Sequence, residues 1–232
     1  MQKDEELLYI KETMNSIAHQ WRQPLSQINS TVSAIDRILY EKNIQDSELE
    51  KRLQEIELLT KYMSNTIDDF KSHFANSAKK VEVKLATVIQ NAIATLEATL
   101  ENNSIEISTD IDADYECSCY DKQLKQIIIV LINNAKDALL DRNTFEAKIG
   151  ISLFQDEGYY IIKIIDNAGG ITKSVMEKMF EPHYTTKHHS QGSGMGLNMA
   201  RKIIQERHYG SLNVKNVEDG SEFSIHLPVE KK

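Results

Sequence analysis

Apolar residues recur at intervals of three and four along the N-terminal part of the chain, and this spacing constrains the fold more than any other feature. A first run contains Leu7, Ile10, Met14, Ile17, Trp21, Leu25, Ile28, Val32, Ile35 and Leu39. After a polar break at residues 43–47, a second run contains Leu49, Leu53, Ile56, Leu59, Met63, Ile67, Phe70 and Phe74. Such spacing places each run on one face of a helix. The sequence therefore predicts two long helices joined by a short turn, with Asp46 or Ser47 as the N-cap of the second helix.

A hairpin made of these two helices buries only part of its apolar surface when it folds alone. Two copies that associate through residues 1–76 would bury the rest in a four-helix bundle. The heptad-like length of both runs favours this homodimer. The alternative is a monomeric hairpin that packs against the remainder of the chain.

The pattern changes in the segment 80–232, where shorter helical and alternating stretches follow one another. The expected helices cover residues 85–100, 121–140 and 197–207. The expected strands cover residues 104–109, 115–119, 148–154, 159–166, 210–217 and 221–227. Strands and helices that mix without strict alternation predict a two-layer α/β sandwich, with helices over one face of a sheet. The whole chain is then an α+β protein with two domains, residues 1–76 and 80–232.

Composition excludes several classes of protein. The formal net charge of −8 over 232 residues argues against nucleic-acid binding, which needs a basic face. The longest uninterrupted apolar run, Ile127–Ile132, is far shorter than the roughly 20 residues that a membrane span requires, so this segment is expected to make no membrane contact. Cys117 and Cys119 lack the second ligand pair of a structural zinc site and are interpreted as reduced strand residues in a cytoplasmic protein.

Two polar segments indicate where a nucleotide base and a metal ion would bind. Residues 133–138, Asn-Asn-Ala-Lys-Asp-Ala, lie on the expected helix 121–140, and residues 166–171, Asp-Asn-Ala-Gly-Gly-Ile, end an expected strand. An ionised Asp166 only accepts hydrogen bonds and suits an exocyclic amine such as that of adenine. Gly170 and the glycine before it allow the backbone to approach a flat base. The neutral oxygen of Asn134 can complete the coordination of a Mg²⁺ ion that phosphates and water otherwise hold.

A third segment, residues 192–197, indicates a phosphate site. Gly192, Gly194 and Gly196 leave backbone N–H groups free to face phosphate oxygens, directly before the helix expected to begin at Leu197. Alone, these glycines are equally typical of a flexible loop, as Asn134 alone is of a helix-surface amide and Asp166 alone of a strand-end turn. The order and separation of all three segments favour a nucleotide site.

These segments resemble the motifs of sensor histidine kinases. The segment around Asn134 is similar to their asparagine box, residues 166–170 to the first glycine box, Phe180-Glu181-Pro182 to the phenylalanine box, and residues 192–196 to the second glycine box. One departure is Ala168, where the family's first glycine box has a middle glycine. Residues 220–223 and 227–228 resemble the closing strand of the same domain. The resemblance implies a Bergerat-type ATP-binding sandwich that uses ATP and Mg²⁺.

The resemblance also assigns roles to other residues of the ATP-binding domain. Asp137 and Leu197, which stand within the matching segments, are implied to belong to the ATP site. Residues 180–196 are implied to form a lid over the triphosphate. Lys187 in this lid is a candidate phosphate contact, with a solvated surface lysine as the alternative.

The first helix resembles the family's histidine box, in which a histidine is followed by proline five residues later and then leucine. Here these residues are His19, Pro24 and Leu25. With Ile17 at the centre of the apolar face, His19 lies roughly 200° around the helix and points away from that face. A neutral imidazole nitrogen is a suitable nucleophile for phosphoryl transfer, so His19 is the expected phosphoacceptor.

Two glutamines accompany this histidine. Many family members carry Glu or Asp directly after the histidine, but here the position is Gln20, which can orient a ring N–H and cannot take a proton. Gln23, one helical turn after His19, could position a water molecule for dephosphorylation of a partner, or be a plain surface residue. The resemblance implies that the partner is the receiver domain of a response regulator, and that the chain acts in the cytoplasm, alone or as the cytoplasmic part of a membrane-bound sensor.

Three other functions compete with this one. ATP hydrolases and ATP-driven clamps of the same fold carry a glutamate four residues before the asparagine, whereas this chain has Val130, which cannot activate water. A protein-serine kinase with this fold would leave the His19 motif unexplained. A non-catalytic dimeric scaffold is disfavoured by the intact Asn134 and Asp166. We therefore predict an ATP-dependent histidine kinase.

Overall fold

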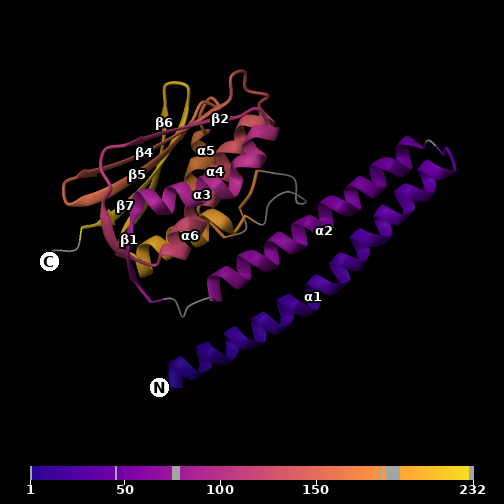
Figure 1. Cartoon of the computed structure of the whole chain (residues 1–232), viewed down its shortest axis with the longest axis horizontal. Coiled ribbons are helices and arrows are strands. Elements are labelled where there is room, and N and C mark those ends of the chain that lie inside the picture. The colour runs from indigo at the N-terminus through magenta and orange to yellow at the C-terminus, as the bar shows by residue number, and fades with distance from the viewer. Residues whose placement is uncertain (1, 45, 75–78, 183, 187–193, 230–232) are drawn as a thin grey trace. The chain divides into compact units, whose positions relative to one another are not determined.

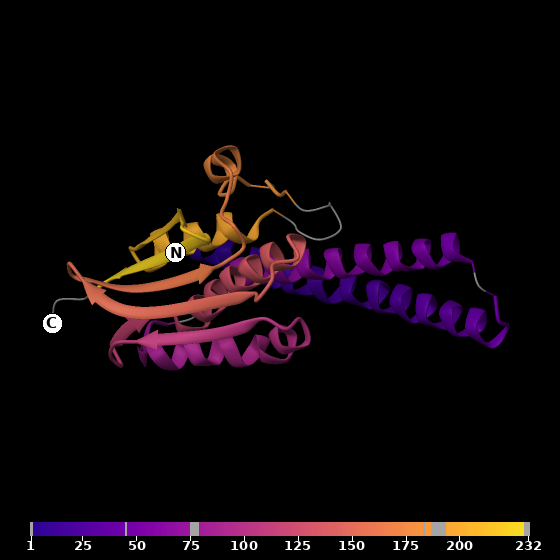
Figure 2. The ribbon, with the colours of Figure 1, turned by 90° about the horizontal axis from the view of Figure 1, so that it is seen from above.

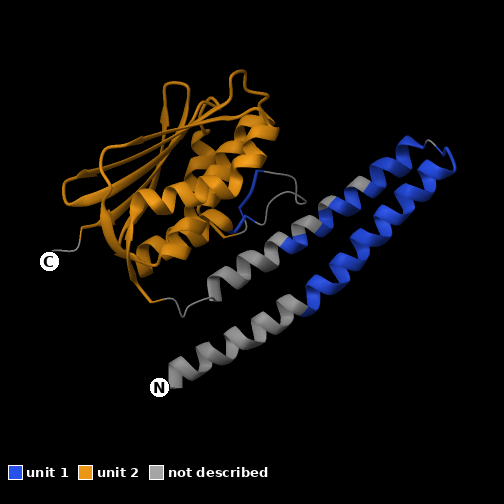
Figure 3. Cartoon of the chain, viewed as in Figure 1, with its two compact units in different colours: residues 1–77, 183–195 blue, residues 78–182, 196–232 orange. Residues whose placement is uncertain are grey.

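The computed structural model describes residues 2–44, 46–74, 79–182, 184–186 and 194–229. In the first two helices, most side chains before Gln20 and after Met63 lie outside the described part. The chain divides into two units. One contains residues 1–77 and 183–195, and the other contains residues 78–182 and 196–232 (Figure 3). Each unit is described by itself.

The first unit is built from two long helices, as predicted. Helix α1 covers Gln2–Glu41 and helix α2 covers Ser47–Phe74; they lie side by side and are joined by a short turn (Figure 1). Asp46 is the N-cap of α2, because its Oδ1 accepts the backbone N–H groups of Glu48 and Leu49 at 3.0 and 3.1 Å. This bond pattern satisfies two of the free donors at the start of the helix.

Only one of the two heptad positions is buried between α1 and α2. Leu25, Val32 and Leu53 are at most 5% exposed. On α2, Leu59 is exposed, as are Ile56 and Met63 of the same predicted run. The structure buries Thr60, because Thr60 lies one heptad after Leu53 and its hydroxyl contacts Asn29 Oδ1 at 2.5 Å.

The alternate heptad position of the hairpin is exposed to solvent. Trp21 and Ile28 on α1 are 50% and 41% exposed, and Ile56 and Met63 on α2 are 39% and 36% exposed. Because these residues stand seven apart on each helix, they form a continuous apolar seam that the hairpin does not cover by itself.

The second unit contains the remaining helices and strands. Its helices are α3 (Leu85–Asn102), α4 (Asp121–Asp141), α5 (Lys173–Lys178) and α6 (Gly196–Arg207). Its strands are β1 (Val81–Lys84), β2 (Glu106–Ile111), β3 (Glu116–Cys119), β4 (Lys148–Asp156), β5 (Tyr159–Asp166), β6 (Ser211–Val217) and β7 (Gly220–Pro228). The sequence pattern predicted all of these except β1 and α5, with ends that differ by a few residues.

The strands form a five-stranded sheet in the order β2-β4-β5-β7-β6 and a separate β1-β3 ribbon. The pair β2-β4 is parallel and the other pairs are antiparallel. Helices α3, α4 and α6 cover one face of the larger sheet, which gives the predicted two-layer sandwich (Figures 1 and 2). The sheet side chains that face these helices form its core: Ile149, Ile151, Leu153, Ile162, Ile164, Phe223, Ile225 and Leu227, none more than 3% exposed.

Two buried groups of this unit have shifted titration. Cys117 and Cys119 lie on β3, as predicted, and form no disulfide bond, and hydrogen bonding to Cys117 together with burial raises the pKa of Cys119. His208 follows α6, and Tyr120 directly precedes α4. Their rings stack edge-on, with ring centroids 5.6 Å apart. Burial, together with the nearby positive charges of Lys80 and Arg207, lowers the pKa of His208 to about 4, so the side chain packs as a neutral ring that joins the ends of α4 and α6.

No helix within the described ranges is long and apolar enough to span a membrane.

Candidate nucleotide-binding site

Asp166 is the last residue of β5 and is only 5% exposed. Its register partner on β7 is Ser221, whose hydroxyl donates to Asp166 Oδ2 at 2.5 Å. The other carboxylate oxygen, Oδ1, accepts the backbone N–H of Ala168 at 2.9 Å and that of Ser221 at 3.4 Å. Because all of these partners are donors, they hold the carboxylate in one orientation. This is the acceptor-only group predicted for an exocyclic amine.

The turn after Asp166 has left-handed backbone at its two glycines. Gly169 and Gly170 have φ angles of +80° and +79°, and Gly169 N–H donates to Asp219 O at 2.8 Å. Ala168, which departs from the family pattern, comes before this left-handed pair and is 4% exposed. Its methyl group therefore packs inside the domain, and the turn forms with alanine in the middle position.

Three side chains hold this turn through contacts between distant parts of the sequence. Asn167 bonds to the start of β4, where its Oδ1 accepts Lys148 N–H at 2.7 Å. Asn216 on β6 pairs with both backbone groups of Ile171 at 2.8 Å. Arg142, directly after α4, donates to the carbonyl oxygens of Ala168 and Gly170, the latter at 2.7 Å. The sequence analysis missed Arg142 and Asn216, because nothing in their local pattern indicates a partner 26 to 45 residues away.

Helix α4 carries Asn134 and Asp137, two of the predicted site residues. Asn134 and Asp137 are half-buried on this helix, and Asp137 pairs with Lys136 at 2.8 Å. Helix α6 begins at Gly196, where an added Cβ would lie 3.4 Å from Val130 Cγ1. The start of α6, with Leu197, therefore packs against α4 about one turn before Asn134. The structure thus brings the end of the second glycine segment to the asparagine helix.

The phenylalanine segment is tied to the same helix. Asn198 on α6 donates to the carbonyl oxygen of Phe180 at 2.6 Å, and the guanidinium of Arg201 lies 4.6 Å from the centre of the Phe180 ring. These two contacts fix residues 180–182 against α6. Residue 182 is the last residue of the first of the two segments that make up the second unit.

Other predicted residues lie in the first unit or outside the described residues. Gly194, with a φ of +65°, belongs to the first unit, and Lys187 and Gly192 lie outside the described residues. Helix α1 runs through His19, whose side chain is also outside the described part. Gln20 and Gln23 are exposed on α1.

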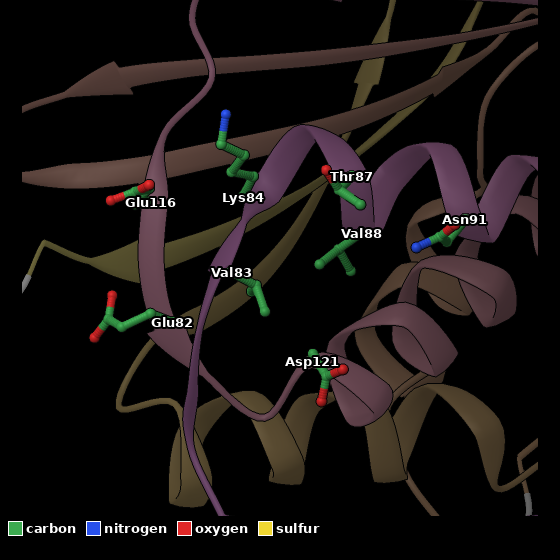
Figure 4. A pocket seen from close by; sticks show the side chains of 8 residues that line it. All are labelled: Glu82, Val83, Lys84, Thr87, Val88, Asn91, Glu116 and Asp121. Atoms are coloured by element: carbon green, nitrogen blue, oxygen red, sulfur yellow. The ribbon is translucent and has the colours of Figure 1, made fainter.

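Two cavities lie in the second unit. One of about 560 Å³ lies beside the glycine turn and is lined by Arg142, Thr144, Phe145, Asn167, Ala168, Gly169, Glu218 and Asp219. The other, of about 370 Å³, lies between β1, β3 and the first turns of α3 and α4, and Val83, Val88 and Asp121 are among its lining residues (Figure 4). Neither cavity is lined by Asn134, Asp166 or Gly170.

Comparison with known proteins assigns a class to this fold and site. Residues 119–231, just under half of the chain, match the family of histidine kinase-, DNA gyrase B- and HSP90-like ATPases. Over nearly the whole chain the similarity is to histidine kinases. Sporulation kinase A of Bacillus subtilis is 30% identical over 98% of this chain and 36% of its own length. The signal transduction histidine-protein kinase AtoS of Escherichia coli is 26% identical over 99% of this chain and 36% of its own length.

A solved structure agrees with these sequence relatives. The catalytic domain of the histidine kinase ThkA is 26% identical and has a TM-score of 0.58, over 65% of this chain and 95% of that domain. In sequence and in fold, the chain is similar to the catalytic core of sensor histidine kinases. It spans about a quarter to a third of the length of the first curated relatives that it matches, from 24% to 36%.

Asp166→Asn is expected to weaken ATP binding by about 10- to 100-fold, which corresponds to the loss of one hydrogen bond to a charged group. The amide keeps one oxygen to accept Ala168 N–H, and its NH₂ can donate to Ser221 Oγ, so the domain should stay folded. Isothermal titration calorimetry measures the affinity, and a thermal melt checks the fold. The control is Asp110→Asn on exposed β2. Unchanged ATP affinity in Asp166→Asn would remove this residue from the site.

Proposed function

We propose that this chain uses ATP and Mg²⁺ to phosphorylate His19 and then passes the phosphoryl group to an aspartate in the receiver domain of a response regulator. Residues 1–76 are the dimerisation and phosphotransfer hairpin, and residues 80–232 are the catalytic domain. The observation that carries the proposal is the buried Asp166 carboxylate, fixed beside two left-handed glycines. This recognition group for a base stands in the same chain as His19, Pro24 and Leu25.

The residues of the second unit fit the parts of a bound nucleotide. Asp166 would accept the exocyclic amine of adenine, and the turn at Gly169 and Gly170 would admit the ring. Asn134 is a half-buried amide whose oxygen would complete the coordination of Mg²⁺. That ion, when bound, would neutralise charge on the β- and γ-phosphates. The backbone N–H group of Gly196, the first residue of α6, would face phosphate oxygens.

The transfer itself forms one bond and breaks one bond. A ring nitrogen of His19 attacks the γ-phosphorus, the bond from that phosphorus to the bridging oxygen breaks, and ADP leaves. The ring must also lose its N–H proton. Gln20 is exposed and can orient that proton through its amide oxygen but cannot accept it, so the proton passes to water or to a phosphate oxygen. Gln20 thus takes a positioning role in this chain.

Similarity to ThkA supports the second half of the proposal. A crystal structure of ThkA in complex with the response regulator protein TrrA matches 98% of this chain with a TM-score of 0.61 and 23% identity. At this identity the match concerns the fold, and ThkA has a response regulator as its partner. We extend that partner class to this chain, with both proteins in the cytoplasm. Exposed Gln23, one turn after His19, would position water when the phosphorylated regulator is hydrolysed.

The exposed seam of the hairpin supports a homodimer. Trp21, Ile28, Ile56 and Met63 together form an apolar strip that a second copy would cover in a four-helix bundle. Ile28→Glu is expected to convert a dimer of twice 26.5 kDa into a monomer, because a charge would be buried in the seam. Light scattering after size-exclusion chromatography measures the mass. Ser30→Glu, at an exposed position off the seam, should remain dimeric. A monomeric native chain would contradict the dimer.

Incubation of the native chain with γ-labelled ATP and Mg²⁺ tests the proposed activity. Label that is lost in acid and kept in alkali establishes a phosphohistidine, and its transfer to an added receiver domain establishes the second step. A chain that binds ATP but remains unlabelled contradicts the autophosphorylation. A chain that binds no ATP contradicts the nucleotide site itself.

A further inference from the structure

Arg142 makes an unusual connection between the asparagine helix and the glycine turn. It follows the last residue of α4, and its guanidinium donates from Nη1 to the carbonyl oxygen of Ala168 and from Nη2 to that of Gly170. An added Cβ on Gly169 would lie 2.8 Å from Arg142 Nη1. The guanidinium therefore spans the turn from one side of Gly169 to the other.

The two glycines are the part of this turn that most needs a support. Two consecutive glycines in the left-handed region can adopt many other conformations at little cost. On the β5 side the turn is held through Asp166 and Ser221, and on the far side through Asn216 and Ile171. Arg142 supports the part of the turn between these two sides, since it donates to the carbonyl groups on either side of Gly169. Its planar fork can hold two acceptors at once, which a lysine cannot do.

We infer that Arg142 is a positioning residue that sets the glycine turn for recognition of the adenine base. This inference rests on the proposed nucleotide site. The two hydrogen bonds that the described residues give the Arg142 guanidinium both go to the turn that follows Asp166, where the base would lie. It also links this turn to α4, the helix that carries Asn134. The base-binding and metal-binding parts of the site are thereby held at a fixed spacing.

Arg142→Ala in the full chain tests the inference. We expect the Kd to rise about tenfold for ATP and by the same factor for ADP, because the loss lies at the base and not at the phosphates. The preference for ATP over GTP should narrow. In the labelling assay, KM for ATP should rise and kcat at saturating ATP should stay within about twofold of the native value. These changes separate a positioning role from general destabilisation, which would lower the melting temperature and the active fraction instead.

A charge-matched control is Lys122→Ala, at an exposed position in the first turn of the same helix. It should keep native affinity for both nucleotides. Equal affinity of the native chain and Arg142→Ala would overturn the inference while leaving the proposed function intact. A loss for ATP but not for ADP would also overturn it, since Arg142 would then act at the phosphates. If the native chain binds neither nucleotide, the proposed function fails first.

Discussion

Substitution of His19 by glutamine is expected to reduce the acid-labile phosphoryl label to background while ATP binding stays unchanged. Glutamine keeps a polar side chain on α1 but offers no nucleophilic ring nitrogen. The nucleotide contacts proposed here come from α4, the turn after β5 and the segment before α6, and none of them involves residue 19. The measurement compares label incorporation and the Kd for ATP in the native and variant chains.

The matched control for this substitution is His226→Gln. His226 lies on β7, on the face of the sheet opposite the core residues Ile225 and Leu227, and is only partly buried. Its loss should leave the label at the native level. Label that persists in His19→Gln would show that another residue accepts the phosphoryl group, and the histidine-box interpretation of α1 would then be wrong.

Replacement of Gly220 by alanine is expected to prevent the second unit from folding stably. A Cβ at this position would lie 1.7 Å from the carbonyl oxygen of Asp166 and 2.6 Å from its carbonyl carbon. Both atoms are backbone, so no side-chain rotation relieves the clash, and β5 and β7 would have to separate where they meet. We expect a loss of at least about 3 kcal/mol, the upper part of the usual range for overpacking. ATP binding should be lost with the fold.

Thermal unfolding followed by circular dichroism measures this effect. Gly150→Ala on β4 is the control, because its Cβ would meet only Ser108 Oγ, at 3.8 Å. That variant should unfold within a few degrees of the native chain, or slightly above it, since alanine restricts the unfolded chain more than glycine does. A Gly220→Ala chain that melts at the native temperature would contradict the close approach of β5 and β7 described here.

Much of the fold could be predicted because its elements have strong local patterns. The spacing of Leu25, Val32 and Leu53 defined α1 and α2, and the alternating residues of β4 and β5 defined a hairpin. The elements that were missed are short. Strand β1 has four residues and pairs only with β3, while α5 has six residues and no buried side chain. Neither is long enough to show a period.

The sequence predicted which residues would contact a nucleotide, but it did not predict which side chains would support them. Asp166, Gly170 and Asn134 belong to segments whose residue types indicate their chemistry. Arg142 and Asn216 support the turn through contacts across the sheet and helix layers, and their neighbours in the sequence give no sign of these partners. The burial of Thr60 in the hairpin was missed because a polar residue occupies a heptad position there.

The bonds of Asp166 have an evolutionary consequence. This carboxylate pairs with Ser221 at the start of β7, beside the close contact at Gly220, so the group proposed to select the base is also part of the join between two central strands. A substitution that removed the bonds of this side chain would weaken the join between the strands together with base recognition, and natural selection would act against both losses. Among relatives of this chain, the nucleotide preference should therefore change as rarely as the residues that join β5 and β7. The exposed Gln20 and Gln23 can change more readily as the partner protein changes.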